Sequence, residues 1–376
     1  FEGVIRVIRW PVKSKAAKKE KTIDYILLIT VLLITVFGLV MLYSTGAYNG
    51  EVRFGDAGYY VKKQFFATSL GLAVMYFVAT RDYHIWEKFA VPAYMLSLVL
   101  SALVLFVGDT YNGSRRWLSL GPLSFQPSEF AKVAVVLFLA AMISRRERRT
   151  LDLKYLVGVF GMTLPIVALV GTNNLSTAII ILGIAVIVVF VSYRTYFPFI
   201  CMGIIGVAFM GVFLSLESYR LERLLIWRNP EEYEKGFQTI QGLYAIGSGG
   251  LFGKGLGESL QKLGFVPEAQ NDMIFSIICE ELGLVGAILV IGIFFVMIWR
   301  FLLAAQYAKD LFGALIGAGI LAHIAIQVIL NIGVVTNTIP NTGITLPFVS
   351  YGGTSIVFLL AEMGLALSLS RSVPEV

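Results

Sequence analysis

The sequence has little charge and almost no cysteine or histidine. Of its 376 residues only 14% are charged and 57% are hydrophobic, whereas soluble domains average about 25% charged residues. This composition excludes an ordinary soluble globular protein and indicates a polytopic membrane protein, because a bilayer supplies the apolar surroundings that such residues need. The two cysteines, Cys201 and Cys279, both lie in apolar runs, which favours buried thiols over a disulfide.

Sequence patterns for several familiar chemistries are also missing. There is no HExxH, CxxC or Ser/His/Asp pattern, so the sequence gives no sign of a common zinc or serine-hydrolase site. The glycine run GSGGLFGKGLG matches neither GxxxxGK(S/T) nor a dinucleotide-binding unit. No metal or other cofactor is predicted, although the sequence leaves a divalent cation open. The net charge of +6 comes without a basic and aromatic module, so no nucleic-acid binding is predicted.

What the chain does contain is a series of apolar runs long enough to cross a bilayer. We predict ten transmembrane helices, near 23–45, 60–80, 85–107, 127–144, 154–171, 175–192, 196–216, 272–299, 311–336 and 350–370. The predicted fold is therefore an all-α polytopic membrane domain over 23–371. A basic cytoplasmic tail at 1–22 precedes it and a short cytoplasmic end at 372–376 follows it.

The lysines and arginines give a test of this topology. Most of them fall in the connections on the side of the N-terminus, as the positive-inside rule requires when both termini are cytoplasmic. A large extracytoplasmic loop, 217–271, then joins helices 7 and 8. The basic balance is thus explained by topology and by contact with anionic membrane lipid.

This topology places the unusual polar sequence on one face of the membrane. A channel would carry polar residues through the bilayer, so clustering at one rim favours chemistry on the extracytoplasmic side. The segments concerned are YNGSRRWLSLGPLSFQPSEFAK at 111–132, the long loop at 220–265, VPEAQNDMIF at 266–275 and NTIPNTGITLPFVSYGGTS at 337–355.

In the first of these segments, Pro127 suits the first turn of a helix and places Glu129 and Lys132 three residues apart on one face. Two readings stay open. The pair could be a structural salt bridge within the membrane. Alternatively, Lys132 with Arg115 and Arg116 could form a cationic pocket for an anionic group such as a diphosphate, unless the two arginines are simply solvated.

Asp272 stands where a polar turn runs into a long apolar helix. A helix N-terminus favours the ionised carboxylate, which suits a general base, although a simple helix cap would look the same. In the long loop, Gln238 and Gln241 could bind a sugar or cap a local helix. Deeper in the apolar run, Glu280 and Glu281 are interpreted as mainly structural.

At this point the residues carry a resemblance. The ordered motifs SRRWLSLGPLSFQPSEFAK, GLYAIGSGGLFGKGLGES, VPEAQNDMIFSIICEELG and NTGITLPFVSYGGTS resemble those of the SEDS family of shape, elongation, division and sporulation proteins, which comprises FtsW, RodA and SpoVE. The last motif and IICEELG look closer to FtsW and SpoVE than to RodA. The resemblance implies a peptidoglycan glycosyltransferase of the bacterial cytoplasmic membrane, which polymerises lipid II on the outer face with a class B penicillin-binding protein as partner.

The same resemblance assigns roles to individual residues. It implies that Asp272 is the essential acid, and that Arg116 and Lys132, with Glu129 beside the lysine, bind substrate. The sequence departs from the family pattern at Gln270 and Asn271, just before this acid. The remaining candidate substrate-binding residues are Arg115, Gln238, Gln241, Glu268 and Ser350.

Two other functions remain open from the sequence. A lipid II flippase would also handle a lipid-linked sugar, but transporters usually place their sites near the midplane within repeated halves, and no internal repeat is found. A scaffold that only recruits a penicillin-binding protein would tolerate changes at Asp272 and Lys132.

Overall fold

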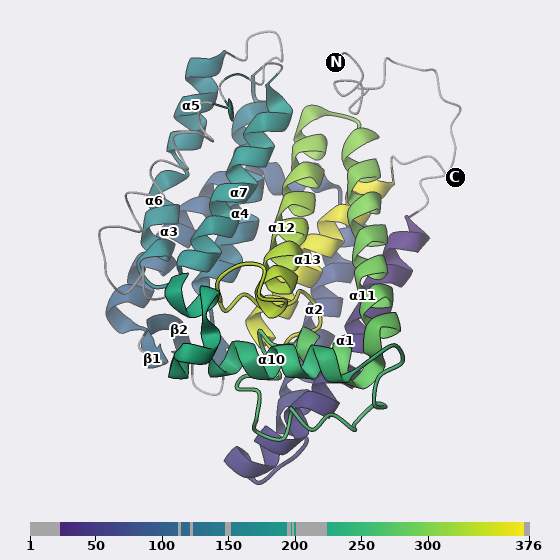
Figure 1. Cartoon of the computed structure of the whole chain (residues 1–376). Helices are drawn as coiled ribbons and strands as arrows, with labels where there is room; N and C mark the ends of the chain where they lie inside the picture. The colour runs from purple at the N-terminus through teal and green to yellow at the C-terminus, as the bar shows by residue number, and fades with distance from the viewer. Residues whose placement is uncertain are drawn as a thin grey trace.

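The computed structural model describes residues 23–111, 114–120, 123–146, 152–193, 197, 199–200 and 224–371. Within them the chain is mainly a bundle of helices that run between two ends, with one helix, α10, lying across the bundle (Figure 1). The α-helices are α1 Tyr25–Phe54, α2 Tyr59–Thr80, α3 Ala90–Val107, α4 Pro127–Ser144, α5 Leu153–Gly161, α6 Leu164–Gly171, α7 Leu175–Ser192, α10 Phe237–Ser248, α11 Ile274–Gln306, α12 Leu311–Val335 and α13 Gly353–Ser370. Short 3-10 helices cover Tyr83–Phe89, Pro230–Glu232 and Glu234–Gly236.

Four of the described α-helices begin where the sequence changes from a capping residue to an apolar run. Side chains of Asp24, Asp152, Asn174 and Asp310 accept hydrogen bonds from backbone N–H groups in the first turns of α1, α5, α7 and α12. Such caps satisfy donors that have no partner inside the helix. The apolar runs then extend each helix across the bundle, which is why most predicted boundaries agree with the structure to within a few residues.

Eight of the helices in the described residues are long and apolar enough to cross a membrane, with 83–107 and 153–171 each counted as one span. The protein is therefore a multi-pass membrane protein. The predicted span at 60–80 is present as α2, which begins with polar residues including Lys62 and Lys63 and is not among the eight. Of the predicted span at 196–216, only residues 197, 199 and 200 are described. The count of ten and the position of the termini stay predictions.

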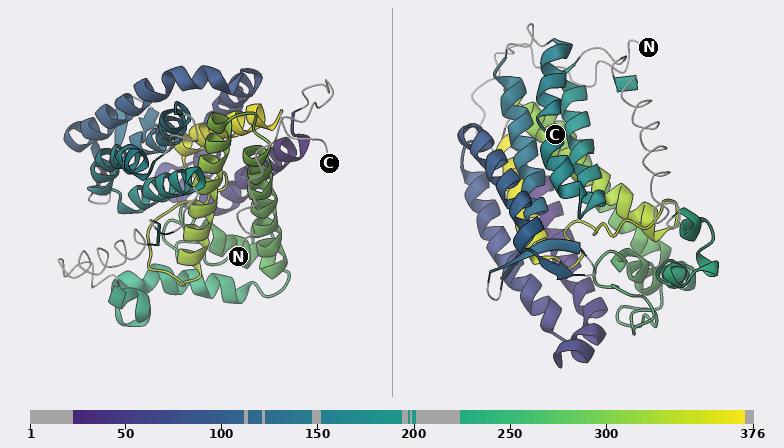
Figure 2. Two further views of the ribbon diagram at one scale, coloured as in Figure 1. Left: turned by 90° about the horizontal axis from the view of Figure 1, so that it is seen from above. Right: turned by 90° about the vertical axis from the view of Figure 1, so that its left-hand side faces the viewer.

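Different elements lie at the two ends of the bundle. At one end, the backbone N–H of Asp24 donates to Ser370 Oγ at 3.2 Å, and Arg300 Nε lies 2.6 Å from Asp24 Oδ2. The start of α1, the end of α13 and part of α11 therefore meet there. At the other end lie α10 and the strands (Figure 1). Figure 2 shows α3 and α10 on opposite flanks of the bundle.

The all-α prediction missed a small antiparallel sheet. Strands β1 Asp109–Tyr111, β2 Ser114–Leu120 and β3 Leu123–Phe125 pair in the order β1-β2-β3, with Ser119 opposite Ser124. The sequence does carry a signal for it, because Asn112-Gly113 and Gly121-Pro122 are typical turn dipeptides on either side of β2. The sheet packs against α3 and the start of α4.

Helix α11 contains a sharp kink. Gly283 has φ 67° and ψ −167°, a backbone conformation that glycine adopts without a steric penalty. Just after the kink, the N–H groups of Leu284 and Val285 donate to the carbonyl oxygens of Gly250 and Leu251, at 2.9 and 3.1 Å. The loop after α10 thus replaces the helical acceptors that the kink removes. The helix begins at Ile274, two residues later than predicted.

Candidate functional site

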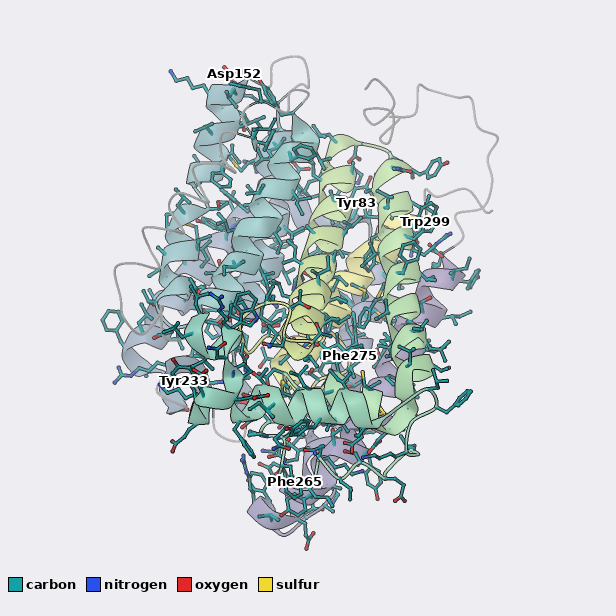
Figure 3. The ribbon with its side chains drawn as sticks, viewed as in Figure 1. Tyr83, Asp152, Tyr233, Phe265, Phe275 and Trp299 are labelled. Atoms are coloured by element: carbon teal, nitrogen blue, oxygen red, sulfur yellow. The ribbon has the colours of Figure 1, made fainter. Side chains whose placement is uncertain are left out.

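Asp272 lies in the turn that leads into α11, which we call the acid turn (residues 267–273). Its side chain is only 9% exposed. Gln238 Nε2, from α10, lies 3.4 Å from Asp272 Oδ1 and equally far from the carbonyl oxygen of Pro267. The carboxylate therefore sits between the end of the bundle and α10. Phe275, which follows one turn later in α11, is labelled in Figure 3 and shows where α11 begins.

The backbone of this turn is held from inside the bundle. Asn331 Nδ2, on α12, donates to the carbonyl oxygens of Asp272 at 2.8 Å and of Ile344 at 2.7 Å. Gly343, with φ 67°, lies close enough that a Cβ there would be 3.9 Å from Asp272 Oδ2. Asn341 Nδ2 in turn donates to Gln238 Oε1 at 3.2 Å. The acid turn, α10, α12 and the segment 341–344 thus meet around Asp272.

The electrostatic state of Asp272 differs from the expectation that the helix start keeps it ionised. Burial, together with the nearby charge of Glu268, raises the pKa of this carboxyl from 3.8 to about 7, although the hydrogen bond from Gln238 acts in the opposite direction. The helix dipole is too weak to reverse the loss of solvent at this depth. A pKa near neutrality nevertheless suits proton transfer, since a base works best when its pKa is close to the operating pH.

Ser350 and Glu268 shape the acid turn. Ser350 Oγ donates to the carbonyl oxygen of Asn271 at 2.7 Å and accepts from the N–H of Leu346 at 2.8 Å. Its hydroxyl therefore ties the 337–352 loop to the acid turn. Glu268, with φ 55°, accepts a hydrogen bond from Asn271 Nδ2. Whether either residue also touches a substrate stays a prediction.

Lys132 and Glu129 form the ion pair that their spacing suggested. Lys132 Nζ lies 3.0 Å from Glu129 Oε1, and the lysine is only 1% exposed. Lys132 Nζ also donates to Gln327 Oε1 at 3.2 Å, and His323 Nε2 lies 2.9 Å from the same oxygen. His323 Nδ1 is 2.7 Å from Glu362 Oε2. The buried lysine is thus one member of a polar chain inside the bundle.

This polar chain reaches the surroundings of Asp272. Gln327 Nε2 donates to the carbonyl oxygen of Thr345 at 3.0 Å, and the preceding residue of the loop, Ile344, is bound by Asn331. His323, Gln327 and Asn331 are spaced by four residues and share one face of α12. One helix face therefore positions both Lys132 and the acid turn, which agrees with the interpretation of this stripe as mainly structural.

Arg115 and Arg116 lie at the same end of the bundle, on β2. Arg115 is exposed and donates from Nη1 to the carbonyl oxygen of Leu105 at 3.1 Å. Arg116 is half-buried, and its Nε donates to the carbonyl oxygen of Asn173 at 2.7 Å. Three residues later, Ser176 Oγ donates to the carbonyl oxygen of Thr342 at 2.5 Å. The start of α7 thus links Arg116 to the 337–352 loop.

A small cavity opens beside the two arginines, between α3, α6 and the start of α4. Asn173, Asn174 and Ser128 contribute to its wall. Gln241, one turn after Gln238 on α10, is half-buried. Within the described residues, no group of three or more His, Cys, Asp or Glu side chains could hold a metal ion.

The interpretation of Glu280 and Glu281 as structural agrees with their contacts. Lys254 Nζ lies 2.7 Å from Glu280 Oε1, and Lys262 Nζ lies 2.7 Å from Glu281 Oε1. Ser44 Oγ donates to Glu281 Oε1 at 2.6 Å. Both glutamates therefore fasten the loop after α10. Cys279 is a buried free thiol, while Cys201 lies outside the described residues.

Comparison with known proteins now bears on this site. The family model described as "Cell cycle protein", for FtsW, RodA and SpoVE, matches residues 24–375. The chain belongs to this family. As a SEDS protein it is 39% identical over 360 residues to stage V sporulation protein E of Bacillus subtilis, covering 94% of this chain and 98% of that protein. It is 35% identical over 356 residues to the probable peptidoglycan glycosyltransferase FtsW of Trichlorobacter lovleyi, covering 93% of each.

Solved structures of SEDS proteins share the fold. One chain of a peptidoglycan synthase complex, studied for the coordination of polymerization and crosslinking, matches with a TM-score of 0.78 and 30% identity, over 93% of this chain and 98% of that one. The crystal structure of RodA from Thermus thermophilus matches with a TM-score of 0.68 and 29% identity, over 93% and 97%. The relatives named SpoVE and FtsW agree with the preference for that subgroup.

Proposed function

We propose that this protein is an inverting peptidoglycan glycosyltransferase, which polymerises lipid II into glycan strands at the outer face of the bacterial cytoplasmic membrane. It would act in cell division or sporulation, as its similarity to FtsW and SpoVE suggests. The observation that carries the proposal is the buried Asp272, which α10, α12 and the 337–352 loop surround and whose pKa is near 7. Relatives named as peptidoglycan glycosyltransferases support the same reaction class.

In the proposed reaction, the 4-hydroxyl of the acceptor sugar attacks the anomeric carbon of the donor. A new bond forms between that oxygen and the anomeric carbon as the bond from the carbon to the diphosphate breaks. Asp272 accepts the hydroxyl proton, and undecaprenyl diphosphate leaves with the bonding electrons. Attack opposite to the leaving group inverts the anomeric centre.

The cations have a separate task, which is to stabilise charge on the departing diphosphate. Lys132 would do so from within the polar chain, and Arg116 and Arg115 from β2. Fixed cations in a site with little water act strongly on developing charge because they need no reorganisation. Gln238, Gln241 and Glu268 would orient the sugars beside Asp272, and Ser350 would keep the acid turn in place.

The proposal also includes a partner, a class B penicillin-binding protein. A matching chain comes from a peptidoglycan synthase complex, which supports an assembly of this kind. Crosslinking by a partner needs new glycan on the outer face, so the partner and Asp272 would work on the same side of the membrane. The sheet and α10 lie at one end of the bundle (Figure 1), and the acid turn contacts α10 there, which supports that arrangement.

The function is tested with purified protein in liposomes that contain lipid II. We expect glycan strands, resolved as a ladder on a gel, and a further gain when the penicillin-binding protein is added. The same reactions with a chelator measure dependence on a divalent cation. Transport of labelled lipid II across the bilayer without any polymer would instead identify a flippase.

The pH dependence of polymerisation gives a second test. Since Asp272 must be ionised to accept a proton, a pKa of about 7 predicts that the rate falls as pH decreases below about 7, by about tenfold per unit. Glu268→Gln removes a charge that raises this pKa, so its acidic limb should move to lower pH. An acidic limb at the same pH in both proteins would contradict the assignment.

A further inference from the structure

The loop between α10 and the acid turn has an unusual distribution of side chains. We call residues 249–265 the glycine-rich loop. Large apolar side chains point outward along it, and Phe252 is 80% exposed. A loop that faces water normally shows the opposite distribution, because exposed apolar area is unfavourable in water. The exposed apolar residues are Leu251, Phe252, Leu256, Leu260, Leu263 and Phe265.

Three polar side chains of the glycine-rich loop bind α11. Lys254 and Lys262 form the ion pairs with Glu280 and Glu281. Ser259 donates to Glu280 as well, and Lys262 Nζ also donates to the carbonyl oxygen of Gly257 at 2.6 Å. The loop therefore holds both of its lysines against α11, whereas its one carboxylate, Glu258, and its large apolar side chains are exposed.

The backbone of the glycine-rich loop is also hydrogen-bonded to α11 at several points. The N–H groups of Lys254 and Gly255 donate to the carbonyl oxygens of Glu280 and Glu281, at 2.9 and 3.0 Å. The carboxylate of Glu280 accepts from the N–H of Leu260 at 3.3 Å. Irregular backbone is tolerated next to hydrocarbon only where its polar groups are satisfied by the protein. These contacts satisfy three of the loop's backbone donors from within the protein.

The position of the loop identifies what covers it. Beyond the kink at Gly283, residues 284–306 of α11 are about 34 Å long at ~1.5 Å per residue, which matches a hydrocarbon core of about 30 Å. The loop carbonyls bound by Leu284 and Val285 lie at the outer end of this segment. There the exposed face of α11, with Ile288 and Leu289, continues into Leu251 and Phe252. Figure 3 shows Phe265 at this end and Trp299 towards the other.

We propose that the glycine-rich loop is a membrane-surface anchor, whose outward apolar side chains insert among the lipids of the leaflet on the side of Asp272. Aromatic and apolar side chains at the boundary of headgroups and acyl chains bind a bilayer in this way. The contact holds α10, and with it Gln238, at the level of the lipid headgroups. It depends on the multi-pass topology and not on the proposed reaction.

The test measures the surroundings of single spin labels in vesicles of phosphatidylcholine and phosphatidylglycerol that contain this protein alone. The parent carries Cys201→Ser and Cys279→Ala. Labels are placed by Phe252→Cys and Leu260→Cys in the loop, with Leu289→Cys as a lipid-facing control and Glu231→Cys as a water-facing control. Collisions with oxygen, which concentrates in hydrocarbon, are compared with collisions with a water-soluble nickel chelate.

We expect the labels at 252 and 260 to favour oxygen over nickel, as at 289 and opposite to 231. Labels in the loop that collide with nickel as often as the label at 231 would overturn the anchor. Labels shielded from both reagents would also overturn it, because they would lie against protein. Should the parent not fold, the test keeps the buried Cys279 and corrects for label that it takes up.

Discussion

Asp272→Asn is expected to lower the rate of lipid II polymerisation by about 10²–10⁴-fold, the usual effect of removing a general base. The amide keeps the shape of the side chain but cannot accept the proton of the attacking hydroxyl at neutral pH. The measurement is the initial rate of glycan formation by purified protein, at a lipid II concentration that saturates the enzyme, so that the rate does not depend on substrate binding. A rate near that of the unmodified protein would remove Asp272 from the mechanism.

The structure indicates that this variant stays folded. Asn331 binds the backbone carbonyl of Asp272 and not its carboxylate, so the turn keeps its main anchor. Burial opposes the charge of the carboxylate, which means that a neutral amide should not destabilise the protein. Thermal unfolding in detergent checks this point. Glu231→Gln is the control, since it converts an exposed carboxylate outside the acid turn to an amide and should keep the rate of the unmodified protein.

Much of this site could be predicted because it rests on short-range features. Pro127 begins α4 and fixes the register that puts Glu129 and Lys132 together, so local spacing was enough to predict their ion pair. Asp272 was identifiable from its motif and from the change from polar to apolar sequence. The roles of Asn331 and Gln327 were not, because a stripe of polar residues on α12 does not state which distant backbone it will meet.

The features that escaped prediction depend on long-range packing. At the kink at Gly283, the carbonyl groups of Gly250 and Leu251, which belong to the loop after α10, replace the local helical acceptors of α11. The raised pKa of Asp272 follows from burial under α10, which no local pattern reveals. The sheet at 109–125 was missed for a different reason, since short strands between turn dipeptides were read as a polar connection.

Lys132→Met is expected to have the second large effect, and on stability as well as activity. Replacement of the lysine leaves Glu129 as a buried charge without its ion-pair partner, which typically costs about 3–5 kcal/mol. Gln327 Oε1 keeps its contact with His323, so the loss should be confined to the carboxylate. A lower midpoint of thermal unfolding in detergent, together with loss of polymerisation, is the expected result. An unchanged midpoint would mean that the ion pair contributes little to folding.

The double variant Glu129→Gln and Lys132→Met separates the two roles that the sequence left open. Replacing a buried ion pair by neutral side chains of similar volume is often neutral or stabilising, so the double variant should recover the stability that the single variant loses. If Lys132 also stabilises the leaving diphosphate, the recovered protein should still polymerise lipid II about 10²–10³-fold more slowly, the usual effect of removing one preorganised electrostatic contact. Recovery of both stability and rate would instead assign the pair a purely structural role and leave the diphosphate to Arg115 and Arg116.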